Sequence, residues 1–374
     1  MKPTGLLAVA LLAAGCRESM GPRAAERGPE TPSFSVAATG PITLDQTTGK
    51  LGETTTIWQD FRPTNPHLGD AIVVTFYWVG STNIITRVYD HLSDAAQTPV
   101  GNTYTLVDFV TAAGVSMATY VATNVQNFPE GTFPNGDQNL VVHADLASPI
   151  QDGGITIAAF RGVSAVTPLA AHQTATGTGS SYPTVADAGE LPADGGALVY
   201  AVTMSSSGRG AEVPSGFTSL GVQTSASMWI EPDYGIQVGT GTVHPQWNWS
   251  FDAPGSWLAS ALILRPAATQ LAFTTQPSTT LPLMAIQPAV TVTALDAAGD
   301  PATSFNGPVT IAIGHNGGLV MPGTLSGTRT VTALNGVATF PDLSIDQLGN
   351  GYTLTVTSSG LTGAESRLFN VGAF

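Results

Sequence analysis

Short apolar runs rich in β-branched and aromatic residues recur along this chain, and turn-forming residues separate them. The strongest run covers residues 71–79 and is apolar at almost every position, as in a central strand buried on both faces. No segment shows helical periodicity over a useful length. Similar runs cover residues 103–110, 117–122, 140–143, 155–160, 197–204, 228–238, 247–251 and 257–264. This spacing predicts an all-β fold, built as a large antiparallel β-sandwich of about 12 strands.

The composition excludes several classes of protein. The chain has 42 glycines in 374 residues and only 10% charged residues, which excludes a coiled coil, and its 43% apolar residues exclude a fully disordered chain. The 12 Lys and Arg against 26 Asp and Glu give a net charge of −14, so we expect no nucleic-acid partner. One cysteine permits no intramolecular disulfide. The length predicts about two domains.

Residues 41–266 form the first predicted domain, which contains a weak internal sequence repeat. The motif Gly69–Val74 is similar to Gly195–Tyr200, and each is followed by a polar loop, a Tyr-containing strand and a closing apolar run. We interpret this repeat as an internal duplication in which two halves build one sandwich, with residues 165–192 crossing between them. The domain resembles unassigned β-sandwich modules of exported bacterial proteins, and this resemblance carries no catalytic residues.

Residues 269–374 form the second predicted domain. Residues 290–295 alternate between apolar and more polar positions, and Asn335 and Gly336 form a strong hairpin signal. Together with the opening segment 270–277, this pattern is similar to the bacterial Ig-like repeats of surface and adhesin-type proteins. The resemblance implies an Ig-like β-sandwich of about seven strands. Such units usually occur in tandem, whereas this chain has one.

The N-terminus has the pattern of an export signal, with a basic start followed by a short apolar run. Leu12 to Cys16 resembles the lipobox of bacterial lipoproteins, although Ala13 stands where leucine is usual. The resemblance implies a lipoprotein signal peptide over residues 1–15, cleavage before Cys16 and a lipid on its sulfur. The alternative is an ordinary signal peptide with an incidental cysteine. Residues 16–40 are polar and lack periodicity, which predicts a flexible tether.

The sequence offers little support for a metal site. The six histidines are far apart, and none forms an H-x-H or H-E-x-x-H pair. Residues 135–139 and 296–300 place Asn and Asp oxygens in tight loops, which suits calcium, but the same side chains also cap ordinary turns. We interpret both loops as turns, and we expect no metal and no cofactor. The chain lacks a G-x-S-x-G motif, so no catalytic nucleophile is indicated.

The aromatic residues between 229 and 249 are the most suggestive feature. Trp247 and Trp249 share one face of a predicted strand, and Trp229 and Tyr234 lie nearby in the sequence. If this face is exposed, it predicts a carbohydrate-binding platform. If it is buried, the same residues belong to the core, as large aromatics of a sandwich strand usually do.

Glu231 and Asp233 form an acidic pair two residues apart. A glycoside hydrolase needs two carboxyls that flank a cleft, so this pair is the candidate for a sandwich-fold hydrolase. The intervening Pro232 argues against a central strand, because proline cannot donate to a strand ladder.

These observations favour a non-enzymatic lipoprotein of the bacterial cell envelope that serves as a surface binding or structural module. The expected partners are the membrane, through the acyl anchor on Cys16, and a polysaccharide or surface protein. The expected location is outside the cytoplasm, in the periplasm or on the cell surface. The first alternative is a carbohydrate-binding surface protein, and the second is a sandwich-fold glycoside hydrolase.

Overall fold

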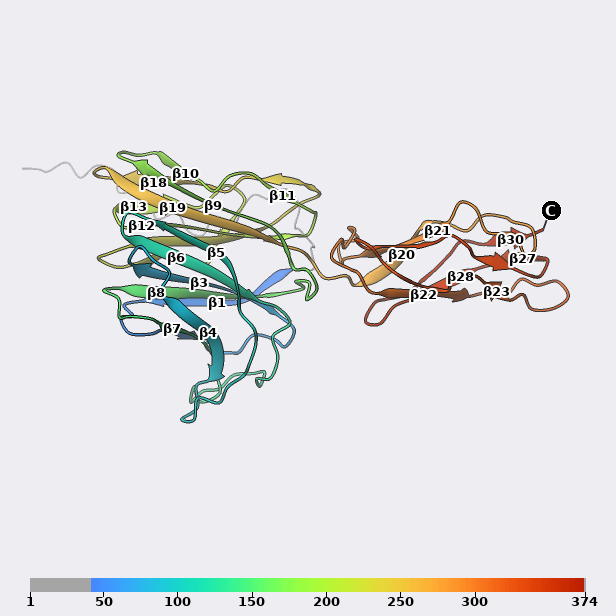
Figure 1. Ribbon diagram of the computed structural model, residues 1–374, viewed down its shortest axis with the longest axis horizontal. Coiled ribbons are helices and arrows are strands. Elements are labelled where there is room, and N and C mark those ends of the chain that lie inside the picture. The colour runs from blue at the N-terminus through green and yellow to red at the C-terminus, as the bar shows by residue number, and fades with distance from the viewer. Residues whose placement is uncertain (1–41, 373–374) are drawn as a thin grey trace, which may run out of the picture.

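The computed structural model describes residues 42–372, and every regular element within them is a β-strand. Strands β1 to β19 form a larger unit that ends at Leu264, and β20 to β30 form a smaller unit that begins at Gln270 (Figure 1). The fold is therefore an all-β arrangement of antiparallel sandwiches, as the sequence predicts. The predicted signal peptide, the tether and Cys16 lie outside the described residues.

The first half of the larger unit contains two sheets. A five-stranded sheet has the order β1-β8-β3-β6-β5, and a three-stranded sheet has the order β2-β7-β4. The strands of this half are β1 (Thr43–Leu51), β2 (Ile57–Asp60), β3 (Ala71–Val79), β4 (Ile85–Leu92), β5 (Thr105–Ala112), β6 (Val115–Ala122), β7 (Leu140–Leu146) and β8 (Gly153–Arg161).

The second half repeats the strand order of both sheets, as the predicted internal duplication requires, and adds a two-stranded sheet, β11-β17. Its larger sheet has the order β9-β19-β12-β16-β14, with β15 also paired to β16, and its three-stranded sheet has the order β10-β18-β13. The strands are β9 (Leu169–Gly179), β10 (Thr184–Asp187), β11 (Leu191–Ala193), β12 (Leu198–Ser205), β13 (Gly208–Glu212), β14 (Thr218–Ser219), β15 (Gln223–Thr224), β16 (Trp229–Ile236), β17 (Gly241–Val243), β18 (Gln246–Phe251) and β19 (Gly255–Leu264).

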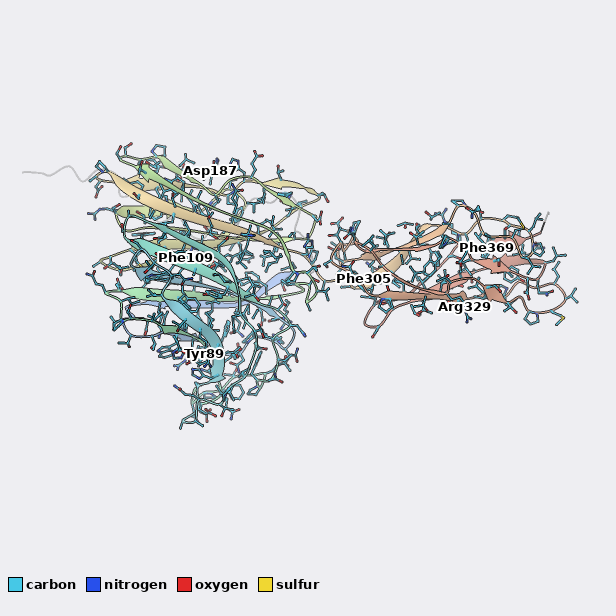
Figure 2. All side chains as sticks on the ribbon, viewed as in Figure 1. Tyr89, Phe109, Asp187, Phe305, Arg329 and Phe369 are labelled. Atoms are coloured by element: carbon cyan, nitrogen blue, oxygen red, sulfur yellow. The ribbon has the colours of Figure 1, made fainter. Side chains whose placement is uncertain are left out.

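The two halves stack through their larger sheets, which gives the unit four layers. The central core joins residues such as Val73 of the first half and Tyr200 of the second. Two further cores lie beneath the three-stranded sheets, and Tyr89 and Asp187 mark these opposite outer layers in Figure 2. Each half is thus a sandwich of its own, which corrects the prediction that both halves build one sandwich.

The buried faces also correct the alignment of the two sequence motifs. Ala71 faces the central core, whereas Ala197, its counterpart in the sequence repeat, faces an outer core. Leu198 faces the same core as Ala71. Because side chains alternate between the faces of a strand, the motifs must be shifted by one residue. The shift matches Gly69 with Gly196, and both have positive φ.

The strands that the sequence did not reveal lie mainly at sheet edges. β9 falls inside the segment 165–192 that we expected to be a crossover. Both β9 and β1 are the outermost strands of their sheets, and most of their residues are half-buried or exposed. Threonine, glutamine and glycine therefore replace the apolar run that marks a central strand.

The smaller unit packs around its own apolar core. Its sheets have the orders β20-β21-β25, β24-β22-β28-β29, β23-β26 and β27-β30. The strands are β20 (Gln270–Thr275), β21 (Val290–Leu295), β22 (Pro308–Ile313), β23 (Leu325–Ser326), β24 (Thr330–Thr332), β25 (Val337–Phe340), β26 (Ser344–Ile345), β27 (Gly349–Tyr352), β28 (Leu354–Thr357), β29 (Ala364–Glu365) and β30 (Phe369–Val371).

Both loops that suggested calcium have the hydrogen bonds of turns. Asp296 Oδ1 accepts the backbone N–H groups of Ala298 and Asp300, each at 2.9 Å. In the other loop, the N–H of Gly136 donates to the carbonyl of Phe133 at 2.8 Å. Asp296 thus caps its turn with its side chain, and the other loop is closed by a backbone hydrogen bond.

Side chains join the two units where the chain passes between them. Thr303 Oγ1 donates to Asp194 Oδ2 at 2.9 Å, and Ser304 Oγ donates to the carbonyl of Pro266 at 3.1 Å. A Cβ on Gly196 would lie 2.6 Å from Asp296 Oδ2, so glycine permits the close approach. The units are therefore packed against each other at this link.

Candidate functional site

A cavity of about 630 Å³ lies where edge strand β5 of the first half meets the second half. The first half contributes residues from segments 101–107 and 121–127, and the second half contributes Pro168, Leu169 and Leu264. We call this space the seam cavity. Its volume lies within the range of about 300–1,000 Å³ that is usual for small-molecule sites.

The described side chains that line the seam cavity are all uncharged, and they divide into three kinds. Side-chain amides come from Asn102, Asn124, Gln126 and Asn127, hydroxyls come from Thr103, Thr105 and Thr123, and apolar surface comes from Leu106, Val107, Val121, Pro168, Leu169 and Leu264. The cavity lining therefore combines apolar surface with neutral hydrogen-bonding groups.

A buried carboxylate fixes one wall of the cavity. Asp90 on β4 is almost fully buried, and it accepts hydrogen bonds from the backbone N–H groups of Gly101 (2.9 Å) and Asn102 (3.1 Å). It also accepts from Asn102 Nδ2 at 2.7 Å and from the Tyr104 hydroxyl at 3.3 Å. Burial raises the pKa of Asp90. Asn102 Oδ1 in turn accepts the N–H of Gln126 at 2.8 Å, which ties the two wall segments together.

Three residues around the cavity hold left-handed backbone conformations without being glycine. Asn124 and Asn127 have φ of 52° and 69°, and Thr167, next to the lining residue Pro168, has φ of 48°. Asparagine tolerates this region, but a β-branched threonine is strained there. Arg265 Nη1 donates to the carbonyl of Thr167 at 3.1 Å and stabilises this conformation. Residues in sparsely populated conformations cluster at ligand sites.

Strand β5 is locked across the two halves just beyond the cavity. Its pairing with β6 is irregular between Leu106 and Asp108, and such bulges re-aim side chains. Asp108 then accepts from Ser260 Oγ at 2.9 Å and pairs with His172 Nδ1 at 2.7 Å. The carboxylate lies between the hydroxyl and the imidazole, so the histidine does not contact the serine as a catalytic base would. The cluster is a structural tie between the halves.

The structure corrects the hypothesis of an aromatic platform. Trp247 and Trp249 are 0% exposed and fill the core beneath β10-β18-β13. Trp229 packs against the same core, whereas Tyr234 points to the opposite face of β16 and contacts Phe160 edge-on at 5.5 Å. The four residues therefore share no exposed face, and a sugar ring cannot stack on the two buried tryptophans.

Glu231 and Asp233 are also enclosed, at 1% and 0% exposure. Ser219 Oγ donates to Glu231 Oε1 at 2.6 Å, and Trp247 Nε1 donates to Asp233 Oδ2 at 2.7 Å. Burial raises the pKa of Glu231 to about 7, and burial together with the nearby Glu231 raises that of Asp233 well above its usual range. A substrate cannot reach carboxyls that are covered in this way, so the pair does not form the cleft of a glycosidase.

The expectation that Pro232 keeps this segment out of a central position was wrong. β16 pairs with β12 on one side and with the short strands β14 and β15 on the other. The carbonyl of Pro232 accepts the N–H of Leu220, which lies between those short strands, at 2.8 Å. The position of Pro232, which has no N–H to donate, therefore faces the gap between β14 and β15. The pairing of β16 with β12 on the other side is complete.

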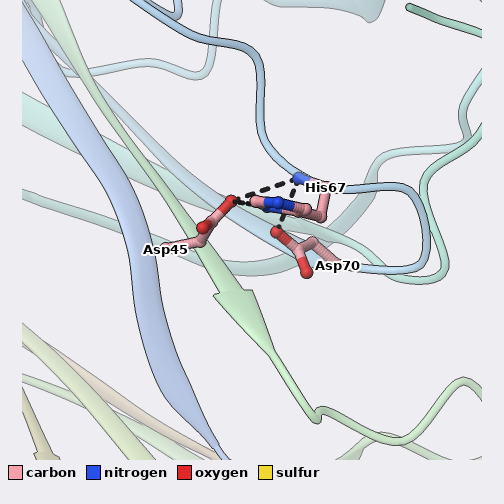
Figure 3. A group of neighbouring side chains, drawn as sticks. All are labelled: Asp45, His67 and Asp70. Carbon is pink, nitrogen blue, oxygen red and sulfur yellow. Dashed lines mark hydrogen bonds and ion pairs between the residues drawn. The ribbon is translucent and has the colours of Figure 1, made fainter. Parts of the chain in front are cut away.

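A second charged cluster joins the start of β3 to β1 (Figure 3). Asp45, His67 and Asp70 place ligand-type atoms within 4.8 Å of one another, and Asp45 Oδ2 pairs with His67 Nδ1 at 2.9 Å. Burial, followed by the hydrogen bond and charge of Asp45, raises the pKa of Asp70 to about 7. Arg161 pairs with Asp45 Oδ1 at 3.3 Å and also contacts His67. The guanidinium already supplies the positive charge, so this cluster is an ion-pair network rather than a metal centre.

The outer face of the first half carries a row of aromatic side chains that the sequence analysis missed. Trp58, His143 and Tyr89 are direct cross-strand neighbours on β2, β7 and β4. His143 stacks on Tyr89 with centroids 4.9 Å apart, Lys50 lies 3.3 Å from the Trp58 ring centroid, and Arg87 lies 3.9 Å from that of Tyr89. Lys50 and Arg87 therefore already cover one face of the Trp58 ring and one face of the Tyr89 ring.

No known family matches the chain. The search of family models, the search of curated proteins and the search of solved structures each returned no match. In residues 42–372 no helix is long and apolar enough to cross a bilayer. The site must therefore be interpreted from its own geometry and chemistry.

Proposed function

We propose that this chain is a non-enzymatic lipoprotein of the bacterial cell envelope whose larger unit binds a ligand in the seam cavity. The observation that carries the proposal is the cavity itself. It has the size of a ligand site, it lies at the junction of two sandwiches, and its walls are fixed by hydrogen bonds to Asp90 and Asn102. Such preorganised walls lower the entropic cost of binding.

The chemistry of the acidic residues supports binding rather than catalysis. The lining side chains lack the titratable groups that general acid–base or nucleophilic catalysis uses. The carboxyl pair of Glu231 and Asp233 is enclosed, and Asp45 and Asp70 belong to an ion-pair network.

The resemblance to the lipobox supports an acyl anchor on Cys16 as the attachment to the membrane. The smaller, Ig-like unit would then act as a spacer or docking surface, because its contacts with Asp194 and Pro266 hold it against the end of the larger unit. Replacing Cys16 by serine is expected to move the protein from the membrane fraction to the soluble fraction. Unchanged membrane fractionation would contradict the anchor.

The binding function is tested with fluorescently labelled full-length chain and isolated cell envelopes. We expect saturable binding that Leu106→Trp abolishes, because Leu106 is 44% exposed in the cavity and a larger ring would fill it. Leu334→Trp is the matched control, since Leu334 is an exposed side chain in the smaller unit. Absence of saturable binding, or equal binding by both variants, would overturn the proposal.

A further inference from the structure

We propose that the ligand of the seam cavity is a neutral carbohydrate. This inference rests on the proposed binding function and specifies its ligand class. It is argued from the charge, the hydrogen-bonding capacity and the apolar surface of the residues that line the cavity, and it moves the carbohydrate site away from Trp247 and Trp249, which the core encloses.

The charge of the cavity lining limits which ligands it can bind. The lining contains no acidic, basic or histidine side chain among the described residues. An ionised ligand would lose its hydration shell without gaining a counter-charge, which is unfavourable. The buried carboxylate behind the wall, Asp90, already accepts hydrogen bonds from Gly101, Asn102 and Tyr104. A neutral ligand is therefore favoured over an acidic or a basic one.

The polar groups of the lining can both donate and accept hydrogen bonds. A sugar hydroxyl both donates and accepts, and amides and hydroxyls complement both roles. Within the described part of the chain, no hydrogen bond is formed by the hydroxyls of Thr103, Thr105 and Thr123 or by Asn124 Nδ2. These groups remain available to a ligand, whereas Asn102 is committed to holding the wall.

Apolar side chains form the other part of the cavity lining. Leu106 is 44% exposed, and the half-buried Val107 and Leu169 add apolar surface from the two sides of the seam. Pyranose rings present C–H groups on their faces and hydroxyls at their rims. A lining that combines aliphatic side chains with amides and hydroxyls offers partners to both kinds of group, and burial of the C–H faces is favourable.

The experiment titrates purified full-length chain with neutral cello-, malto-, xylo- and manno-oligosaccharides, and in parallel with acidic oligogalacturonates and alginate oligosaccharides. We expect saturable binding of at least one neutral series and none of the acidic series. Thr105→Val removes a hydroxyl without changing shape and is expected to weaken binding by about tenfold. Asn124→Asp keeps the left-handed φ available and introduces a charge, so it should weaken binding at least as much.

The matched control is Asn335→Asp. Asn335 also has positive φ, 49°, and lies in the smaller unit, so it undergoes the same chemical change at a comparable turn. If neither Thr105→Val nor Asn124→Asp weakens neutral-sugar binding relative to this control, the location of the site is overturned. Binding of only the acidic series would overturn the ligand class.

Failure of this inference and failure of the proposed function give different results. If the chain binds isolated envelopes through Leu106 but no neutral oligosaccharide binds or competes, the ligand class is overturned while the binding function stands. Competition by protease-sensitive envelope material alone would identify a peptide ligand and would likewise overturn the carbohydrate assignment. If envelopes do not bind either, both proposals fall.

Discussion

The two halves of the larger unit share one topology but use it differently. Beneath its three-stranded sheet the second half buries Trp247 and Trp249, whereas the first half carries Trp58 and Tyr89 on the outside of the equivalent sheet. The seam differs as well. At β15, Gln223 Nε2 donates to the carbonyl of Ile155 at 3.3 Å and to a neighbouring threonine hydroxyl, so that end is bridged. The equivalent end at β5 holds the cavity. The common scaffold sets the fold, and the departures from symmetry create the candidate site.

The largest effect is expected from the tryptophans that distinguish the halves. Trp247→Ala should lower the free energy of unfolding by about 3–5 kcal/mol, because it leaves a cavity in the core and an unpaired Asp233. Trp58→Ala, at 37% exposure, should lower it by less than about 1 kcal/mol. Denaturant unfolding of both variants measures the difference, and equal losses would contradict the contrast between the layers.

The next largest effect is a dependence of the unfolding free energy on pH, which arises from Glu231 in the second half. The folded chain retains this proton up to about pH 7, whereas the unfolded chain releases it near pH 4.5. Stability is therefore fully present below pH 4.5 and falls as the pH rises towards 7, by up to about 3 kcal/mol. Glu231→Gln should make the unfolding free energy fall less steeply over this window, while Asp233 and Asp70, whose pKa values are also raised, keep their contributions.

The first half provides the matched variant for that titration. Asp70, whose pKa is also about 7, contributes the same sign of pH dependence over a window that starts near pH 3.8. Asp70→Asn should remove that part while the contribution of Glu231 persists. A Glu231→Gln profile that still declines as steeply as that of the unmodified chain would show that the buried carboxyl is not the source.

A smaller effect is expected from the tie between the halves. Asp108→Asn keeps the side-chain shape but removes the charge that pairs with His172, so the free energy of unfolding should fall by about 1–3 kcal/mol. Because the tie lies beside the seam cavity, ligand affinity should fall as well. Calorimetry with and without ligand measures both changes, and a variant with unaltered stability would show that the tie is not needed.

The smallest effect sharpens the comparison of the two seam ends. Gln223→Ala removes the bridge at β15 and should cost about 1 kcal/mol without changing ligand affinity, because this residue lies at the other end of the seam. Gln126→Ala, in the cavity wall, should instead weaken binding. Equal affinities for the two variants would place the ligand elsewhere.

The central strands could be predicted because burial on both faces leaves an apolar run. β3 begins and ends where the sequence predicts, at Ala71 and Val79. Edge strands such as β9 could not be predicted, since a polar, half-exposed face leaves no such run. The place of β16 inside its sheet could not be predicted from Pro232, because the sequence does not show where the neighbouring ladder is interrupted.

The candidate site was harder to predict than the fold. Leu169 and Leu264 meet the wall that holds Asn102 only because the second half stacks on the first. The only local signal was the density of asparagine and threonine in segments 101–105 and 123–127, which is equally typical of turns. Trp247 and Trp249 do share one face of a strand, as predicted, but that face lies in a core. Alternation along a strand shows which side chains share a face, and it does not show which face is buried.

The exchange of strand contacts between the halves has an evolutionary consequence. In topology, β1 of the first half corresponds to β9 of the second, and β5 corresponds to the edge that holds β15. β5 packs on β9, and β15 packs on β1. Exchanging the two halves therefore maps one contact onto the other. A single half would expose the large apolar sheet that now forms the central core, and it would be expected to pair with a second copy. The unit can thus be regarded as a fused homodimer. In a symmetric dimer both ends of the seam would be identical, whereas here Gln223 bridges one end and Asp108 ties the other end beside the cavity.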